Sequence, residues 1–477
     1  MKSATRHSQL EPRALDQSDF AVMAGLAAIA AIVILPGLGV QSLANWDEAI
    51  YGVLTRELLA DPALTLRYGD RLWFEKPPFA FWLMAVSSSA FGLTEFALRL
   101  PSALFGIAAI VLQYLAGRRL GNRTAGVFAA VLLLGVPQFV AYSRMAMTDV
   151  PLATLGMLCI VLLLYANGRS SLILAAGAAF GVAILTKSAA AFIFLPGLLA
   201  IVIAEHGLAF LRSREIWLAT TVAIAVALPW HVWLAWMYGG SFVDQYFGFH
   251  ILARFAAPLE GHEGGSLYYL QTYFQKAGFL APVHAAGIML TVSLAIVRRD
   301  RLLAATSILA LAALAIVSMQ GTKIGGYLTP VYPAAALAAT LGIARLIRNT
   351  RTLGALLVVT TLLALPGIVI GRGPFAETSD LVHFSPEVRA FRNTHIFANG
   401  RVPLLYSFGL SEPALRFYLA DDVRPIGEFE LVRLFSGKQP FLCLTFNSEA
   451  AKFARKHPDL RFEIIVSTES LALIGYP

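Results

Sequence analysis

Long apolar runs separated by short basic clusters constrain the fold of this chain more than any other feature. The first run covers residues 20–40 and the last covers residues 353–370. An α-helix needs roughly 20 apolar residues to cross the hydrocarbon core of a bilayer. The chain is 57% hydrophobic and only 14% charged, whereas a soluble protein carries about 25% charged residues. We therefore predict a polytopic α-helical membrane protein.

The basic clusters orient the predicted spans. No small-residue cleavage pattern follows residues 20–40, so this run is expected to be a retained first helix behind a cytoplasmic tail of residues 1–19. Clusters at residues 118–123, 298–301 and 345–351 fall in the cytoplasm if residues 79–92 do not cross. That run is short and contains three consecutive serines, so we predict an amphipathic helix on the outer surface, with another at residues 49–59.

This arrangement predicts about 11 spans. They cover residues 20–40, 100–117, 125–141, 151–166, 172–186, 189–204, 216–236, 277–297, 302–319, 327–344 and 353–370. After residue 371 the composition changes, and short strands at 402–408, 423–426, 440–446 and 462–467 alternate with helices at 412–419 and 448–456. Such alternation favours a small α/β domain, here on the periplasmic side. The predicted domains are residues 1–371 and 372–477.

Composition also bounds the partners and cofactors. The net charge of +8 comes from short clusters between apolar runs, which gives no reason to expect nucleic acid. No glycine-rich phosphate loop follows a predicted strand, so no nucleotide is expected. Cys159 and Cys443 have no metal-type spacing, and Cys443 is expected to be packed within a strand.

Acidic residues occur where predicted spans end on the outer side. Asp47 and Glu48 follow the first span, and Asp149 precedes the span at 151–166. Two carboxylates can divide the work of glycosyl transfer, one as a base and one orienting partners or holding a metal. The alternative is helix capping, which acidic residues also favour. Capping alone is an equal alternative for Asp149, whereas capping needs only one member of the Asp47–Glu48 pair.

Several cations lie at the same outer level and are not explained by the positive-inside rule. They are Arg56, Lys76, Arg144, Lys187, Arg254 and Lys323. A single one would be a snorkelling anchor. Together they predict an anion site for a phosphate or pyrophosphate. Glu75 and His262 could hold a divalent cation, although a single loop histidine is more often solvated.

These residues resemble a known family as a set. Asp47-Glu48 with Tyr51 and Arg56 is similar to the first outer loop of the GT-C glycosyltransferases, especially the bacterial aminoarabinose transferases and their protein mannosyltransferase relatives. The motifs that follow in the family's order, between residues 45 and 335, are Phe74-Glu75-Lys76-Pro77, Thr148-Asp149, Thr186-Lys187, His250 through Arg254 to His262 and Tyr268-Tyr269, and Lys323, Tyr327, Pro330 and Pro333.

The resemblance implies an enzyme with a polyprenyl-phosphate sugar donor. It implies that Asp47 is the catalytic carboxylate, Asp149 the second carboxylate, and Lys76 and Arg254 the donor-phosphate ligands. Glu48, Tyr51, Arg56, Arg144, Lys187, Lys323 and Tyr327 would contact substrate, and Glu75 and His262 would form a possible metal position. The chain is shorter than the aminoarabinose transferases, and its stretch from 250 to 268 differs.

The expected function is transfer of a sugar to lipid A, another glycan or a protein, on the periplasmic face of the bacterial inner membrane. A transporter or flippase of lipid-linked sugars is the alternative. Such proteins are often built from inverted repeats with broken helices at mid-membrane. No repeat is evident here, and the polar residues gather at helix ends. A non-catalytic subunit of an envelope complex stays open if Asp47 is dispensable.

Overall fold

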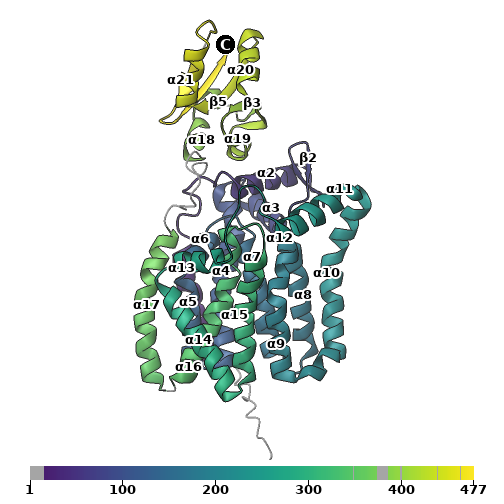
Figure 1. The fold of residues 1–477 in the computed structure, drawn as a ribbon, viewed down its shortest axis with the longest axis vertical. Helices are drawn as coiled ribbons and strands as arrows, with labels where there is room; N and C mark the ends of the chain where they lie inside the picture. Colours follow the sequence, from purple (N-terminus) through teal and green to yellow (C-terminus); the bar gives the residue numbers. More distant parts are fainter. Residues whose placement is uncertain are drawn as a thin grey trace, which may run out of the picture. The chain divides into compact units, whose positions relative to one another are not determined.

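The computed structural model describes residues 15–347, 349–372, 385–397, 400–437, 439–461 and 463–476. They form two compact units, each with its own internal contacts (Figure 1). The first unit takes its residues from 1–36, 74–80 and 101–373, and the second from 37–73, 81–100 and 374–477. The predicted boundary after residue 371 therefore describes only part of this division. The second unit also includes residues 37–73 and 81–100, which come from the first quarter of the chain.

The first unit is a bundle of long apolar helices. Its helices are α1 (Gln17–Ile34), α5 (Arg123–Leu134), α6 (Pro137–Ser143), α7 (Asp149–Ala166), α8 (Ser170–Lys187), α9 (Leu195–His206), α10 (Arg214–Tyr238), α11 (Gly240–Phe242), α12 (Arg254–Ala256), α13 (Tyr268–Lys276), α14 (Ala281–Arg298), α15 (Arg301–Met319), α16 (Val331–Leu346) and α17 (Thr350–Arg372). Most of α4 (Glu95–Leu120) also belongs to it. The 3-10 turns are η1 (Ser188–Phe194), η2 (Leu208–Arg212), η4 (Gly278–Leu280) and η5 (Gly325–Leu328), and η3 (Val243–Ala253) is a π-helix.

The number of spans is slightly lower than the sequence predicts. The described residues contain nine helices long and apolar enough to cross a membrane, or ten if α5 and α6, bent by 75°, form one span. The prediction of about 11 counted residues 172–186 and 189–204 as separate spans. Here they fall within one apolar stretch, Ser170–His206, in which α8 is followed by the turn η1. The predicted surface helix at 79–92 is α3 (Phe79–Phe91), shorter than a span.

Small residues allow close helix packing in the first unit. Helix α8 packs against both α7 and α10 (Figure 1). A Cβ atom added at Gly177 would lie 2.2 Å from the carbonyl oxygen of Ala219, and one at Gly181 would lie 2.6 Å from that of Ala223. Two glycines four residues apart therefore let the α8 backbone touch α10, as small residues do in many membrane helix pairs.

The basic clusters predicted to share one side of the membrane do gather at one end of these helices. Asp19, in the first turn of α1, accepts hydrogen bonds from Arg118 at 2.9 Å and Arg123 at 3.0 Å. Arg119 donates to the carbonyl oxygen of Leu164 near the end of α7 at 2.9 Å. Arg345, near the end of α16, donates to the carbonyl oxygen of Leu120 at 3.4 Å. Arg348 and residues 1–14 of the predicted tail lie outside the described residues.

The second unit contains a five-stranded mixed sheet. Its strands follow the order β4-β3-β5-β7-β6, with β3 parallel to β4 and β5, and β7 antiparallel to β5 and β6. Their bounds are β3 (Val402–Phe408), β4 (Ala420–Pro425), β5 (Phe441–Phe446), β6 (Glu463–Ser467) and β7 (Leu471–Tyr476). The helices are α18 (Ser385–Phe391), α19 (Pro413–Tyr418), α20 (Glu428–Gly437) and α21 (Asn447–Lys456), with the turn η6 (His395–Phe397).

The α/β domain is confirmed, with three elements that the sequence prediction missed. Helices α18 and α20 and strand β7 were not expected, although β7 lies in the interior of the sheet and buries most of its side chains. Cys443 on β5 is fully buried, as predicted. Phe462, the predicted first residue of β6, lies outside the described residues.

The second unit also holds the first loop of the chain. It includes α2 (Asp47–Ala60), most of α3 and the antiparallel hairpin of β1 (Leu66–Tyr68) and β2 (Arg71–Trp73). Helix α2 packs against α19. The Cβ of a residue replacing Gly52 would lie 2.7 Å from the Phe417 ring, so only glycine fits that contact.

Candidate active site

A buried ion pair lies where two helices of the first unit meet. Asp149 is in the first turn of α7 and is 2% exposed, and Lys187 is the last residue of α8. The Lys187 Nζ donates to the Asp149 Oδ1 at 2.6 Å. This end of α7 and α8 is opposite to the end that holds Leu164 and the basic clusters. The carboxylate therefore has a specific cationic partner besides the favourable helix start.

The Lys187 cation also approaches an aromatic ring. Its Nζ lies 5.1 Å from the centre of the Tyr327 ring, which belongs to the turn η5. The Tyr327 side chain in turn favours the charged form of Arg254, as do Glu75 and Glu260. Burial disfavours the Arg254 cation, but these neighbours prevail and raise its pKa.

Glu75 and Lys76 join this group from the loop before α3. Their side chains form an ion pair at 3.0 Å, with 23% and 13% of their surfaces exposed respectively. Burial disfavours the Glu75 carboxylate, yet its interactions with Lys76, His250 and Arg254 outweigh this effect and lower its pKa. Burial lowers the pKa of His250, and the Glu75 charge offsets this only in part.

The resulting group combines the predicted cations Lys76, Lys187 and Arg254 with the carboxylates Glu75 and Asp149. One of its nitrogen atoms, Arg254 Nε, is buried without a hydrogen-bond partner in the described part of the chain, and so is Nδ1 of His250, a neighbour of Glu75. Buried polar groups normally have partners, and an orphan of this kind requires an explanation. A guanidinium N–H that faces no protein acceptor suits an anionic oxygen.

Two other predicted cations, Arg144 and Lys323, donate hydrogen bonds to backbone carbonyl oxygens at helix C-termini. Arg144 donates through Nη1 to the carbonyl oxygens of Ile34 at 2.6 Å and Pro36 at 2.9 Å, where α1 ends. Lys323 donates through Nζ to the carbonyl oxygen of Ser318 at 2.7 Å, where α15 ends, and lies 5.3 Å from the Tyr269 ring. Cations at helix C-termini satisfy unpaired carbonyls and the helix dipole.

In the second unit, Asp47 and Glu48 begin α2, but only Glu48 is fully buried. Glu48 is 1% exposed, and its carboxylate receives two hydrogen bonds from Arg99 at 2.9 and 2.8 Å and one from the Ala44 amide at 2.9 Å. Arg99 also donates to the carbonyl oxygens of residues 38, 41 and 42. The pair therefore fixes the loop that leads to Asp47, whose own side chain is half-buried.

Tyr51 and Arg56, predicted to contact substrate, make packing and hydrogen-bond contacts within the second unit. The Tyr51 ring is 1% exposed and packs edge-on against Phe81, with 5.0 Å between ring centres. Arg56 donates to the carbonyl oxygen of Arg416 at 2.8 Å and pairs with Glu57 at 3.0 Å. Both side chains thus support α2.

The residues proposed for a metal do not form a ligand set in the described part of the chain. No group of three or more His, Cys, Asp and Glu side chains suited to a metal occurs among those residues. The neighbours that act on Glu75 are Lys76, His250 and Arg254, two of which are cations. The described contact of His262 is through its backbone, which accepts from the Lys323 amide at 3.0 Å. These residues do not fit a metal, and we derive no step through one.

Sequence reasoning missed Arg99 and did not single out His250 by its surroundings. Arg99 was the easier of the two to predict from the sequence, because a charged residue at the edge of an apolar run requires a partner. It also missed Gln138, which donates to the carbonyl oxygen of Gly325 at 3.0 Å and accepts from the Tyr332 hydroxyl at 2.6 Å. Gln138 thereby holds the turn that carries Tyr327.

Comparisons of the sequence agree with the family resemblance. Residues 75–233 match the family described as dolichyl-phosphate-mannose-protein mannosyltransferase. An undecaprenyl phosphate-alpha-4-amino-4-deoxy-L-arabinose arabinosyl transferase of Pseudomonas savastanoi is 30% identical over 221 residues, which are 43% of this chain and 40% of that protein. The enzyme of the same name from Yersinia enterocolitica is 28% identical over 259 residues, 51% of this chain and 46% of that protein. The chain thus matches less than half of these relatives' lengths.

Solved structures extend the likeness to nearly the whole chain. The crystal structure of ArnT from Cupriavidus metallidurans bound to undecaprenyl phosphate has a TM-score of 0.76 at 20% identity, covering 97% of this chain and 99% of that one. This chain has the GT-C glycosyltransferase fold. The Archaeoglobus fulgidus oligosaccharyltransferase in complex with Zn and sulfate shares the GT-C fold with a TM-score of 0.55 at 15% identity, covering 91% of this chain and 69% of that one.

Proposed function

We propose that this GT-C protein is a membrane glycosyltransferase that moves a sugar from a polyprenyl phosphate to an envelope acceptor. The observation that carries the proposal is the partly buried group of Lys76, Lys187 and Arg254 with Glu75 and the buried Asp149, together with an unpartnered guanidinium nitrogen of Arg254 among the described residues. Ionisable groups enclosed in the membrane part of a protein are rare, and when they pair with one another they mark ligand or ion sites. The site lies on the periplasmic face of the bacterial inner membrane, opposite the basic clusters, and the acceptor is lipid A, another glycan or a protein.

The cations prepare the donor for cleavage. A lipid phosphate leaves readily when its charge is neutralised, and Lys76 and Arg254 supply that charge at the level of the headgroups. Arg254 gives a planar, permanently charged fork, whereas Lys76 gives a compact point charge. The lipid tail lies along the apolar helices, so the phosphate is the part of the donor that needs polar ligands. No nucleotide is required for this binding.

Asp47 acts on the acceptor. It removes the proton of the acceptor hydroxyl, the hydroxyl oxygen bonds to the anomeric carbon, and the bond from that carbon to the phosphate oxygen breaks. The polyprenyl phosphate departs with the electron pair, and its charge is held by the cations. Asp149 orients Lys187 through their 2.6 Å bond.

Glu48 is a positioning residue in this scheme rather than a substrate ligand. Both of its oxygen atoms are taken by Arg99 and by the Ala44 amide. The pair fixes the entry to α2, and with it the position of Asp47.

The test compares donor binding and turnover in purified protein. Lys76→Ala should weaken binding of an undecaprenyl-phosphate sugar by about one to two decades, since a charge-assisted bond contributes roughly 1.5–3 kcal/mol. Lys452→Ala is the matched control, because Lys452 also pairs with a nearby glutamate but lies exposed on α21. Donor affinity unchanged in Lys76→Ala would remove this residue from the site.

The acceptor step is tested separately with Asp47→Asn. This change should cost about two to four decades in rate, the usual share of general base catalysis, while donor binding persists. Asp61→Asn, at the other end of α2, is the control. Near-normal turnover in Asp47→Asn refutes the base, and loss of donor binding along with turnover indicates a structural role.

A further inference from the structure

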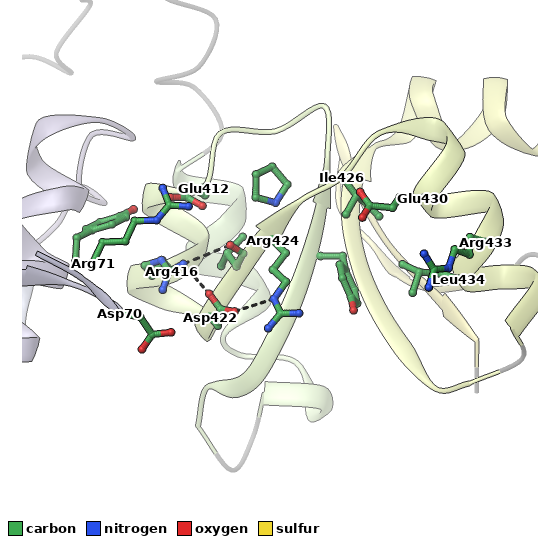
Figure 2. A pocket seen from close by; sticks show the side chains of 14 residues that line it. Asp70, Arg71, Glu412, Arg416, Asp422, Arg424, Ile426, Glu430, Arg433 and Leu434 are labelled. Atoms are coloured by element: carbon green, nitrogen blue, oxygen red, sulfur yellow. Dashed lines mark hydrogen bonds and ion pairs between the residues drawn. The ribbon is translucent and has the colours of Figure 1, made fainter.

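The second unit contains a cavity that the proposed reaction does not use. Its volume is about 780 Å³, within the range of small-molecule sites. The tip of the β1–β2 hairpin, α19, the edge strand β4 and the first turns of α20 all contribute to its lining (Figure 2). Its side chains are mostly polar, in contrast to the apolar helices of the first unit.

Arg416 is the buried polar element of this cavity. It is 7% exposed, and its guanidinium donates to the Asp422 carboxylate at 2.8 Å (Figure 2). The guanidinium also lies 5.2 Å from the centre of the Tyr68 ring. Its Nε is buried and has no hydrogen-bond partner among the described residues. The cavity is thus lined by a buried arginine whose hydrogen-bonding capacity is not fully used within the described residues.

The hairpin tip is shaped to approach this guanidinium. Gly69 has a φ of +60°, and a Cβ added there would lie 2.6 Å from the Arg416 Nη1. The positive φ favours glycine, and a side chain at this position would displace the end of the Arg416 side chain. The wall formed by Asp70 and Arg71 is therefore held against Arg416 by backbone geometry.

Positive and negative groups balance in the lining. Arginine donors come from Arg71, Arg416, Arg424 and Arg433. The acceptors are the carboxylates of Asp70, Glu412, Asp422 and Glu430 (Figure 2). A site for a simple anion would show an excess of cations, which this lining lacks.

Donors and acceptors placed side by side suit a ligand that is rich in hydroxyl groups. Each hydroxyl can donate one hydrogen bond and accept two, so it uses both arginine and carboxylate partners. A cavity of this size accommodates a ligand of one or two sugar rings. The chemistry of the lining thus favours a saccharide over an anion or an apolar molecule.

A peptide added to the sheet edge is disfavoured by the same arginine. Strand β4 is at the edge of the sheet, where an extended segment could pair with it. Arg416 already donates to two carbonyl oxygens of β4, those of Asp421 at 3.0 Å and Val423 at 3.3 Å. A charged side chain held against β4 in this way disfavours pairing of a further strand at the edge.

We propose that this cavity is a saccharide-binding site of the second unit, which takes one or two sugar rings through Arg433, Glu430, Arg71 and Arg416. The site goes beyond the proposed transfer reaction, because it stands on the cavity alone and does not involve Asp47 or the cation group. The C-terminal residues would thus bind a carbohydrate at a site separate from that of the lipid donor.

The experiment measures saccharide binding to the full-length protein in detergent by saturation-transfer NMR. The probes are disaccharides of glucose, galactose, glucosamine and N-acetylglucosamine. At least one should bind the unchanged protein, and Arg433→Gln and Glu430→Gln should each weaken that binding at least fivefold. Both side chains are exposed, so the variants should melt at the temperature of the parent protein. Arg455→Gln, an exposed arginine on α21, should leave binding unchanged.

Several results would overturn the inference. They are the absence of binding by every disaccharide, equal binding in both cavity variants, and displacement of the disaccharide by inorganic phosphate or by an extended peptide. Asp47→Asn should retain disaccharide binding, and Arg433→Gln should retain binding of the lipid donor. The outcome for this cavity is thereby separated from the outcome for the transfer reaction.

Discussion

Replacing Arg99 by methionine should destabilise the second unit strongly. The guanidinium makes five hydrogen bonds, two to the Glu48 carboxylate and three to carbonyl oxygens of residues 38, 41 and 42. Its side chain is 5% exposed and that of Glu48 is 1% exposed. Methionine fills a similar volume but leaves Glu48 buried without a counter-charge. Breaking a buried pair in this way costs about 3–5 kcal/mol.

The assay is thermal unfolding of the purified protein in detergent, followed by intrinsic fluorescence. A loss of 1 kcal/mol lowers the melting temperature by about 2–4 °C in a domain of 150–250 residues, so Arg99→Met should melt roughly 6–20 °C lower. Arg389→Met is the matched control in the same unit. It removes an ion pair to Glu95 at 3.2 Å, but the Arg389 side chain is 39% exposed, so the cost should stay below about 1 kcal/mol.

The double variant Arg99→Met with Glu48→Gln isolates the cause. It removes the stranded charge, so it should recover part of the stability that Arg99→Met loses, and the two changes should not be additive. Hydrogen exchange at residues 38–48 should rise in Arg99→Met, because the loop carbonyls lose their common donor. The reasoning is wrong if Arg99→Met melts like Arg389→Met, or if the double variant is no more stable than Arg99→Met.

Other expectations follow from the same contacts. Lys187→Met should lower the transfer rate at least tenfold, because it leaves the buried Asp149 carboxylate without its cationic partner. Adding Asp149→Asn should restore part of the rate in a transfer assay, and an absence of rescue would show that the two residues do not act as a pair. Burial lowers the pKa of His250 in the folded protein, so the unfolded chain binds the proton first as pH falls. The melting temperature should therefore decrease as the pH falls below the ordinary pKa of histidine. His250→Gln should reduce this pH dependence, and an unchanged slope of melting temperature against pH would contradict the prediction. Cysteines at Arg299 and Ser448, both exposed, should differ in labelling by an impermeant reagent on intact cells; only Ser448→Cys should label, and the reverse pattern would invert the orientation.

Local patterns allowed much of the fold to be predicted. Strand 402–408 and helix 448–456 were placed within one residue, because alternation and helical periodicity depend on neighbours in the chain. The grouping of basic clusters at one end of the bundle followed from apolar run lengths. Strand β7 was missed because its residues, buried on both faces in the sheet interior, show little alternation.

The sequence by itself determined that this is a chain of membrane-spanning helices with a small α/β domain and ionisable groups at helix ends. Apolar length and composition are sufficient for that, since the bilayer imposes them on each segment separately. Only the tertiary structure decided which charges pair. Glu48 and Arg99 are 51 positions apart, and Asp149 and Lys187 are 38 apart. Their partnership, like the capping of α1 by Arg144, arises when distant segments pack and must satisfy each buried charge.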